Sequence, residues 1–206
     1  MKKRISKVKR KTTETNIEIK LDLDGAGKYS INTGIAFLDH MLSLFSNHGL
    51  FDLTIMAKGD LKVDIHHTNE DVGIALGEAF AKSIEDKKGI RRFGSIAVPM
   101  EEALARVALD ISGRPSLHMG YGGRKILPPD LKEETVKETG NYNLNDAKQF
   151  LEAFVRSAGI NLHIEYLGED LHHILEAVFK ALGRALCEAT RIDPRIKGIP
   201  STKGRL

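Results

Sequence analysis

The spacing of hydrophobic side chains divides the chain into segments of two kinds. In segments of the first kind apolar and polar residues alternate, which is the period of a strand with one buried face. The strands predicted in this way cover residues 14–23, 51–57, a short stretch at 61–65, and then 102–111 and 162–166.

In the second kind, hydrophobic residues recur every three or four positions, which predicts amphipathic helices. Two such helices contain the hydrophobic residues of 37–45 and of 150–155, and each ends near a glycine. Two longer ones begin at His66 and at His172. Strands and helices therefore follow one another in a regular order along the chain.

This order of elements occurs twice. Residues 14–25 align with residues 102–113 at a constant offset of 88, and both stretches read as strands closed by a glycine. The repeated unit is strand, strand, helix, one or two strands, helix. We therefore predict an α+β fold: an internally duplicated α/β sandwich of two similar halves, in which helices cover one face of each small sheet.

The duplication also suggests where the chain divides. We expect residues 1–88 to form the first half and residues 89–190 the second. A charged segment rich in Gly and Pro, at about 120–145, has no counterpart in the first half and is expected to be a loop or mobile flap. A basic tail, residues 191–206, follows the second half.

Composition is that of an ordinary soluble globular protein, with 41% hydrophobic and 29% charged residues among 206. No apolar segment follows the basic start, so we expect neither a secretory signal nor a membrane-spanning helix. Cys187 is the only cysteine, which excludes a disulfide within the chain and favours a cytoplasmic location. The net charge is +3 and basic residues gather at both ends, as in solvated faces, small-anion sites or nucleic-acid-binding arms.

The motif His-His-x-x-Glu occurs at residues 66–70 and again at 172–176. On a helix, residues i and i+4 lie one above the other, so one histidine of each pair shares a face with the glutamate while the other points about 100° away. Imidazole and carboxylate ligands suit Mn, Fe, Zn or Ni. One copy alone arises easily by chance on a polar helix face, whereas two copies at identical spacing favour a two-metal centre.

Two further pairs of residues correspond in the repeat. Placing the first half on the second sets His40 opposite Gln149, so the duplication predicts a histidine where the chain has a glutamine. A glutamine oxygen is a weaker, neutral, hard ligand, and the alternative is that Gln149 lies on a helix face without a role. Glu14 and Glu102 also correspond, and taken alone both read as ordinary carboxylates at strand edges.

Six motifs together give the sequence a family resemblance. They are FLDHML at 37–42, HGLFD at 48–52, HHTNED at 66–71, SGRP at 112–115, HHILEA at 172–177 and PSTKG at 200–204. From about residue 10 to the end, the chain resembles imidazoleglycerol-phosphate dehydratases. The resemblance implies dehydration of imidazoleglycerol phosphate to imidazoleacetol phosphate in histidine biosynthesis. It also implies two Mn²⁺ ions per active site and a homo-oligomer of 24 subunits with active sites between them.

The resemblance also implies roles for individual residues. The metal ligands of the family fall on His40, His66, His67, Glu70, His172, His173 and Glu176, and an eighth position, a histidine in the family, falls on Gln149. The catalytic glutamate falls on Glu14. The substrate-binding positions fall on His48, Arg92, Arg114, Lys180, Ser201 and Lys203, of which the basic residues and Ser201 suit a phosphate.

These residue types match the chemistry of the implied reaction. Two metal ions can hold an imidazole ring as its anion, and a general base must then remove a proton from carbon. A metal hydrolase is the nearest alternative enzyme. A nucleic-acid-binding protein is the alternative of another class, because the ends of the chain are basic and the duplicated sandwich is of a type shared with ribosomal proteins. We expect a small phosphorylated imidazole as partner, without nucleic acid or membrane.

Overall fold

The computed structural model describes residues 3–122 and 139–206. Most of the insertion expected at 120–145 therefore lies outside the described residues. The first half contains β1 (Ile5–Lys11), β2 (Thr15–Asp22), β3 (Tyr29–Asn32), α1 (Ala36–Gly49), β4 (Asp52–Gly59) and α2 (His66–Ile84). The second half contains β5 (Phe93–Met100), β6 (Ala103–Asp110), β7 (Ser116–Tyr121), α4 (Leu144–Ala158), β8 (Asn161–Leu167) and α5 (Leu171–Thr190).

The two halves have the same topology. Each forms a four-stranded mixed sheet, with the order β1-β2-β4-β3 in the first and β5-β6-β8-β7 in the second. The first three strands of each order pair antiparallel, and the last pair is parallel because a helix crosses over between its strands. The predicted internal duplication is confirmed. The division at residues 88 and 190 stays a prediction.

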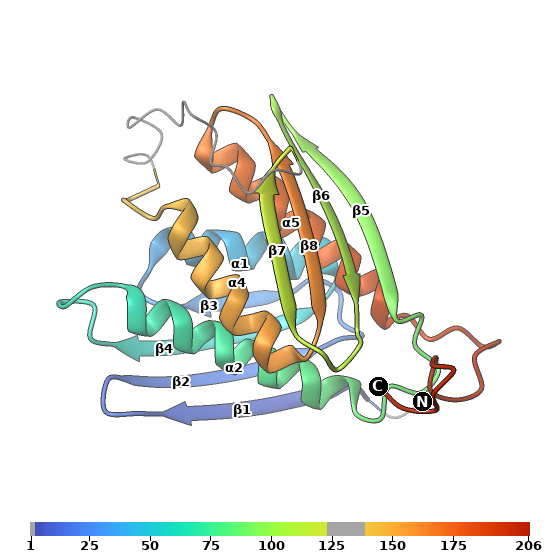
Figure 1. Cartoon of the computed structure of the whole chain (residues 1–206). Helices are drawn as coiled ribbons and strands as arrows, with labels where there is room; N and C mark the ends of the chain where they lie inside the picture. Colours follow the sequence, from blue (N-terminus) through green and yellow to red (C-terminus); the bar gives the residue numbers. More distant parts are fainter. Residues whose placement is uncertain (1–2, 123–138) are drawn as a thin grey trace.

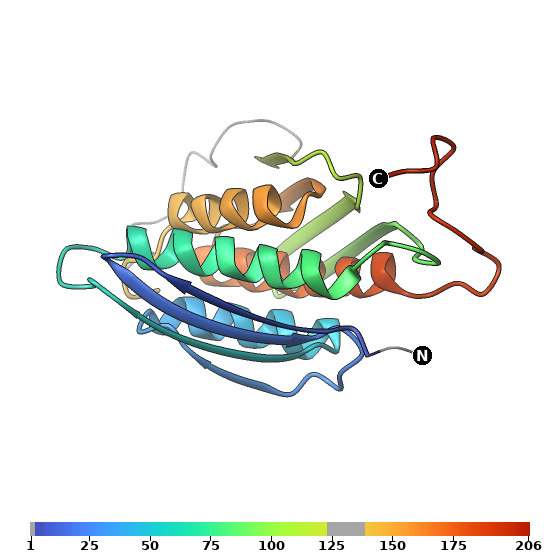
Figure 2. The same ribbon diagram turned by 90° about the horizontal axis from the view of Figure 1, so that it is seen from below.

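The helices lie between the two sheets. Helices α1 and α2 pack on the first sheet, and α4 and α5 pack on the second. Across the molecule α2 packs on α4 and α1 packs on α5, as Figures 1 and 2 show from two directions. Each of these two helix contacts therefore joins the first helix of one half to the second helix of the other.

Small residues allow the helices to approach closely at these contacts. A Cβ added at Gly73 would lie 2.6 Å from the carbonyl oxygen of Phe150, and one at Gly183 would lie 2.4 Å from that of Phe45. Gly49, which we expected to mark the end of α1, serves the same purpose, since its own Cβ would meet the carbonyl oxygen of Gly183 at 3.0 Å. Residue Leu50, with a φ of 57°, takes the left-handed position after the helix.

One predicted element is wrong. Residues 61–65 form a turn, in which the Val63 N–H donates to the Asp60 carbonyl at 2.7 Å, and not a strand. Val63 is 71% exposed, so the alternation there does not reflect a buried face. Among the residues that the structure describes, none of the helices is long and apolar enough to cross a membrane.

Candidate metal-binding site

His40, on α1, meets two residues of α5. Its Nε2 lies 2.8 Å from Glu176 Oε1, and His172 Nε2 lies 3.2 Å from the same oxygen. One donor atom from each of the three residues lies within 4.8 Å of the others. We call these three residues the His40 cluster. Its ligands come from both halves of the chain, because α1 and α5 pack together across the molecule.

Glu176 is the buried member of the His40 cluster. Its other oxygen, Oε2, accepts a hydrogen bond from Lys180 at 2.5 Å, one helical turn further along α5. Burial alone would raise the pKa of this carboxyl, but hydrogen bonds from Lys180 and His40 outweigh it and lower the pKa to about 2. The carboxylate is therefore anionic and ready to bind a cation.

A second cluster occupies the equivalent place between α2 and α4. His66 Nδ1 lies 2.9 Å from the side-chain oxygen of Gln149, and His66 Nε2 lies 3.7 Å from Glu70. Arg156 of α4 lies 3.7 Å from the other oxygen of Glu70. We call His66, Glu70 and Gln149 the His66 cluster. Gln149 corresponds to His40, as the repeat alignment predicts.

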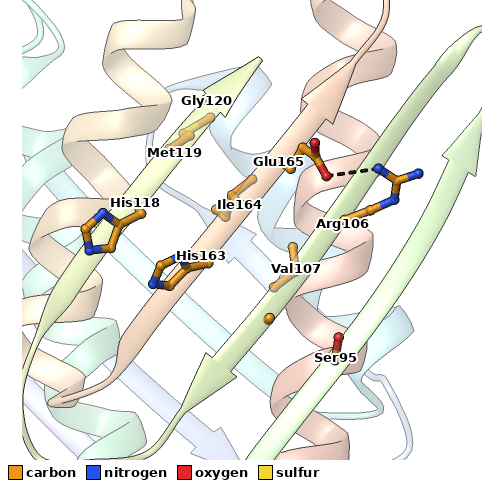
Figure 3. A pocket seen from close by; sticks show the side chains of 10 residues that line it. Ser95, Arg106, Val107, His118, Met119, Gly120, His163, Ile164 and Glu165 are labelled. Atoms are coloured by element: carbon orange, nitrogen blue, oxygen red, sulfur yellow. Dashed lines mark hydrogen bonds and ion pairs between the residues drawn. The ribbon is translucent and has the colours of Figure 1, made fainter. Parts of the chain in front are cut away.

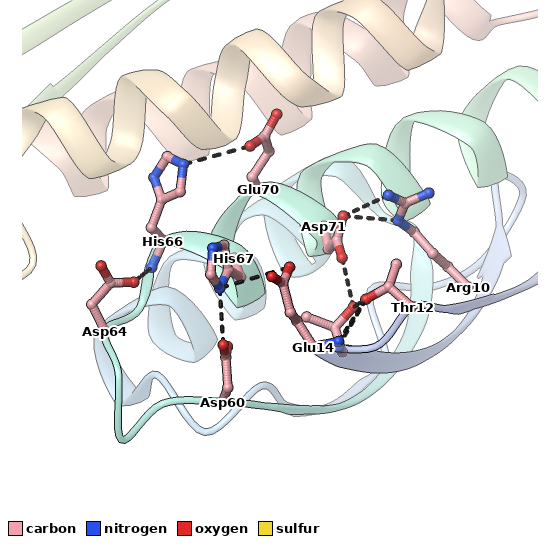
Figure 4. Close-up of polar contacts among 10 residues, drawn as sticks. Arg10, Thr12, Glu14, Asp60, Asp64, His66, His67, Glu70 and Asp71 are labelled. Carbon is pink, nitrogen blue, oxygen red and sulfur yellow. Dashed lines mark hydrogen bonds and ion pairs between the residues drawn. The ribbon is translucent and has the colours of Figure 1, made fainter.

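The remaining histidine of each motif points elsewhere. His67 Nδ1 lies 2.9 Å from Asp60 Oδ2 and 3.8 Å from Glu14 Oε2, and His173 Nδ1 lies 2.7 Å from Glu102 Oε2. Figure 4 shows His66 and Glu70 directed toward α4 while His67 lies on the opposite side with Glu14 and Asp60. This division follows from the 100° step between neighbouring residues on a helix.

These carboxylates raise the pKa of both outward histidines. The hydrogen bond to Asp60 is the main cause for His67, and the one to Glu102 is the main cause for His173. A carboxylate on Nδ1 also fixes the ring so that Nε2 faces away from it. Both histidines therefore present a ring nitrogen to the outside of the chain.

Two aspartates that the sequence analysis did not single out stand just before α2 and α5, the helices that carry the His-His-x-x-Glu motifs. Asp170 accepts hydrogen bonds from the backbone N–H groups of His172 and His173 at 2.7 and 3.3 Å, as an N-cap of α5. Asp64 accepts from the N–H of His66 at 2.8 Å. Both aspartates stand two positions before the first histidine. The repeated pattern Asp-x-His-His was the available signal.

A pocket of about 520 Å³ opens beside the His40 cluster. Phe37 packs edge-on against His172, with ring centroids 5.2 Å apart, and also contacts the ring of Tyr142. The buried Tyr142 hydroxyl donates to Asn69 Oδ1 at 3.0 Å. The pocket is lined by residues 34–37, His40, Ile65, Thr139, Gly140, Tyr142 and His172. It offers an apolar and aromatic wall next to three potential ligands.

The residues predicted to bind phosphate lie in two places. Lys180 belongs to the surroundings of the His40 cluster, as described above. Arg92 lies at the other end of α5, where its N–H donates to the Ala189 carbonyl and its guanidinium binds Asp110 through two hydrogen bonds of 2.6 and 2.9 Å. From His172 to Ala189 the helix rises about 25 Å. One chain therefore does not bring Arg92 to its own His40 cluster.

The other predicted phosphate residues lie near Arg92. Arg92 donates to the Pro200 carbonyl at 2.9 Å, which ties the basic tail to this end of the molecule. The Ser201 hydroxyl accepts from the N–H of Lys203 at 3.2 Å, and Arg114 donates to its neighbour Ser112 at 3.4 Å. Neither Arg114 nor the exposed Lys203 forms an ion pair with an acidic side chain in the described part of the chain. Figure 1 shows the tail, in red, beyond the end of α5.

Three histidines lie outside both the clusters and the two motifs. His48, in the last turn of α1, lines a separate pocket of about 240 Å³ with Arg184 and Glu188, and burial is the main cause that lowers its pKa. His118 and His163 face each other on paired strands β7 and β8, with their rings stacked 4.4 Å apart. Figure 3 shows them on the outer face of the second sheet. His163 is thus a surface strand residue, as its position in the alternation predicts.

The comparisons with known proteins agree on one family. The family model for imidazoleglycerol-phosphate dehydratase matches residues 33–186. The chain is 58% identical over 204 residues to the imidazoleglycerol-phosphate dehydratase of Thermoanaerobacter pseudethanolicus, covering 98% of this chain and 100% of the relative. It is 53% identical to that of Clostridium botulinum over 207 residues, covering 100% of both.

Solved structures of the family have the same fold. The imidazoleglycerol-phosphate dehydratase of Staphylococcus aureus superposes with a TM-score of 0.75 at 37% identity, covering 92% of this chain and 99% of that one. The Pyrococcus furiosus enzyme, solved in complex with (S)-C348, gives 0.78 at 35% identity, covering 97% and 100%. This chain therefore belongs to the imidazoleglycerol-phosphate dehydratases, the lyases that carry out the dehydration step of histidine biosynthesis.

Proposed function

We propose that the chain dehydrates imidazoleglycerol phosphate to imidazoleacetol phosphate with two Mn²⁺ ions per active site. The observation that carries the metal assignment is the double construction of the site. Each cluster contains one imidazole and one carboxylate from the same helix. A third side chain comes from the helix that packs against it.

The donor atoms fit a divalent metal of this kind. In the His40 cluster two imidazole nitrogens and a carboxylate oxygen converge within 4.8 Å. Mixed nitrogen and oxygen ligands suit Mn, and the neutral oxygen of Gln149 is a ligand that Mn tolerates better than Zn does. When bound, the two ions would act as Lewis acids toward the nitrogens of the substrate's imidazole ring.

Each cluster offers three ligands from one chain, so further ligands must come from elsewhere. His67 and His173 present ring nitrogens to the outside, and they are the two histidines of the motifs that the clusters do not use. We assign them to the clusters of neighbouring copies. The active sites then lie between subunits of a homo-oligomer, for which we propose 24 copies in a closed shell.

The same arrangement accounts for the phosphate residues. In a neighbouring copy, Arg92, Arg114, Ser201 and Lys203 could approach a substrate whose ring lies at the His40 cluster, whereas within one chain Arg92 is about 25 Å along α5 from His172. Guanidinium, ammonium and hydroxyl groups are the donors that phosphate oxygens require. We assign Lys180 and His48 to substrate contacts on the α1 and α5 side.

Glu14 is the proposed general base and acid. Its carboxylate is exposed at the turn between β1 and β2, beside His67 and therefore beside a site completed in a neighbouring copy. In the reaction Glu14, as the acid, gives a proton to the hydroxyl of the substrate, whose C–O bond breaks so that it leaves as water. The Glu14 carboxylate, now the base, then takes the proton of a C–H bond. The electron pair of that C–H bond forms the double bond of an enol, which becomes the ketone of the product.

Turnover and metal content of the purified chain test this proposal. We expect about two Mn per chain and formation of a ketone, detectable in the ultraviolet under alkali. Removal of the metal with a chelator should abolish turnover and reduce the particle size measured by light scattering. Full activity in the double variant His172→Ala, His173→Ala, or in metal-free protein, would refute the two-metal assignment.

A further inference from the structure

The turns β1–β2 and β5–β6 carry corresponding glutamates that the two halves use differently. In the second half, Glu102 accepts hydrogen bonds from His173 Nδ1 at 2.7 Å and from the backbone N–H groups of Asp170 and Glu169 at 2.9 and 3.3 Å. Three donors therefore hold this carboxylate in place. Glu14, in the first half, has as its side-chain partner only His67, at 3.8 Å, among the described residues.

The first residue after β4, Asp60, takes over the histidine of the first half, whereas Glu169, at the corresponding position after β8, contacts no histidine with its side chain among the described residues. Asp60 Oδ2 lies 2.9 Å from His67 Nδ1, closer than Glu14 by 0.9 Å. Figure 4 shows Asp60 and Glu14 approaching the same histidine from two segments of the chain. The other oxygen of Asp60, Oδ1, is buried and has no hydrogen-bond partner within the described ranges.

The connection before the motif helix explains why an acidic residue at this position contacts the histidine in only one half. Residues 60–65 connect β4 to α2, whereas the shorter segment 168–170 connects β8 to α5. The longer connection forms the turn from Asp60 to Val63, and this turn places the Asp60 side chain under His67. The second half has no room for such a turn, so Glu102 must hold His173 itself.

A carboxylate that holds the Nδ1 proton of an imidazole is committed to that contact. It orients the ring, fixes the tautomer and leaves Nε2 free to bind a metal, but it is not available to take a proton from a substrate. Of the two hairpin glutamates, only Glu14 is relieved of this task.

We propose that Asp60 and Glu102 are the positioning residues for His67 and His173, and that Asp60, by holding His67, frees Glu14 for proton transfer. This inference rests on the proposed metal-ligand roles of the two histidines and on Glu14 as the base. It divides three carboxylates that look alike in the sequence into two that act on a histidine and one that acts on the substrate.

The test measures Mn²⁺ binding and turnover separately in matched variants. Metal-free protein is titrated with Mn²⁺, followed by its electron paramagnetic resonance signal, and kcat is measured at saturating Mn²⁺. For Asp60→Ala and Glu102→Ala we expect about 10- to 100-fold weaker binding, with partial rescue of binding in Asp60→Asn. At saturating Mn²⁺ much of kcat should return in Glu102→Ala but not in Asp60→Ala, because without Asp60 the carboxylate near His67 is that of Glu14. For Glu14→Gln we expect unchanged Mn²⁺ binding and a kcat lower by about 10²- to 10⁴-fold.

Glu169→Gln is the control, because this neighbouring carboxylate is exposed and its side chain contacts no histidine in the described structure. Circular dichroism shows whether each variant is folded. Wild-type Mn²⁺ binding in folded Asp60→Ala, or a loss of kcat without a loss of binding in Glu102→Ala, would overturn the inference. Unchanged kcat in Glu14→Gln, or no Mn²⁺ binding by the wild-type chain, would overturn the proposed function first, so the two failures are distinguishable.

Discussion

Close packing of α2 on α4 can be tested by adding one methyl group at Gly77. An alanine Cβ there would lie 2.5 Å from the carbonyl oxygen of Phe154, 2.7 Å from the Cβ of Ser157 and 2.9 Å from the nitrogen of Ala158. Two of these atoms belong to the backbone, so they cannot rotate away. The helices would have to separate by roughly 1 Å to restore ordinary contact distances.

The energetic consequence can be worked out from two opposing effects. Overpacking of this kind costs about 1–3 kcal/mol, and the rigid neighbours place Gly77→Ala in the upper part of that range. Replacing a helical glycine by alanine returns up to about 1 kcal/mol through helix propensity. We therefore expect a net loss of about 1–2 kcal/mol in the free energy of unfolding, or about 2–8 °C in Tm for a chain of this size.

Guanidinium unfolding followed by circular dichroism measures this loss. Both proteins must be free of metal and at equal concentration, since bound metal and assembly stabilise the folded state. Gly198→Ala is the control, because a Cβ there meets nothing within 4 Å, and it should leave the free energy of unfolding nearly unchanged. If Gly77→Ala is as stable as the wild type or more stable, α2 and α4 do not pack as closely at Gly77 as the structure shows.

Three further predictions concern single side chains. Gln149→His should tighten Mn²⁺ binding at the His66 cluster by about 10-fold or more, since imidazole is the stronger ligand, and an unchanged titration would exclude ligation from this position. Arg10→Ala should lower the free energy of unfolding by about 2–3 kcal/mol, because Arg10 lies 2.7 Å from the buried carboxylate of Asp71; a loss below 1 kcal/mol would contradict this. The Arg4 hydrogen bond lowers the pKa of Asp24 below 3.8, so the stabilisation exists above that pH and is lost as the pH falls through the folded-state pKa. Asp24→Asn should cost under about 1 kcal/mol at pH 7, since the Asp24 side chain is 54% exposed, and an equal cost at pH 2 would refute the assignment.

The sequence predicted the fold wherever one face of an element is buried. The strands β2 and β6 and the four helices of the described residues follow from their hydrophobic spacing. Strand β1 is different, because its inward side chains include Ser6 and its outward ones are basic. Its segment therefore reads as a charged arm, and the sheet alone reveals it as a strand paired with β2.

The sequence also placed the motif histidines on their helices and identified Gln149 as the counterpart of His40. It could not show which helices meet, because the contact of α1 with α5 depends on packing between distant segments. Asp60 was missed for a related reason. Its contact with His67 depends on a turn at residues 60–63 where the pattern suggested a strand.

The packing of α1 on α5 and of α2 on α4 makes the covalent connection between the two halves important. Each cluster takes a carboxylate helix from one half and its third ligand from the other, so neither half alone carries a complete set. Two separate half-chains would have to find each other before either cluster formed. Joining them in one polypeptide makes that encounter intramolecular, at an effective concentration on the order of millimolar or higher. The covalent link between the halves therefore contributes to forming the proposed metal site.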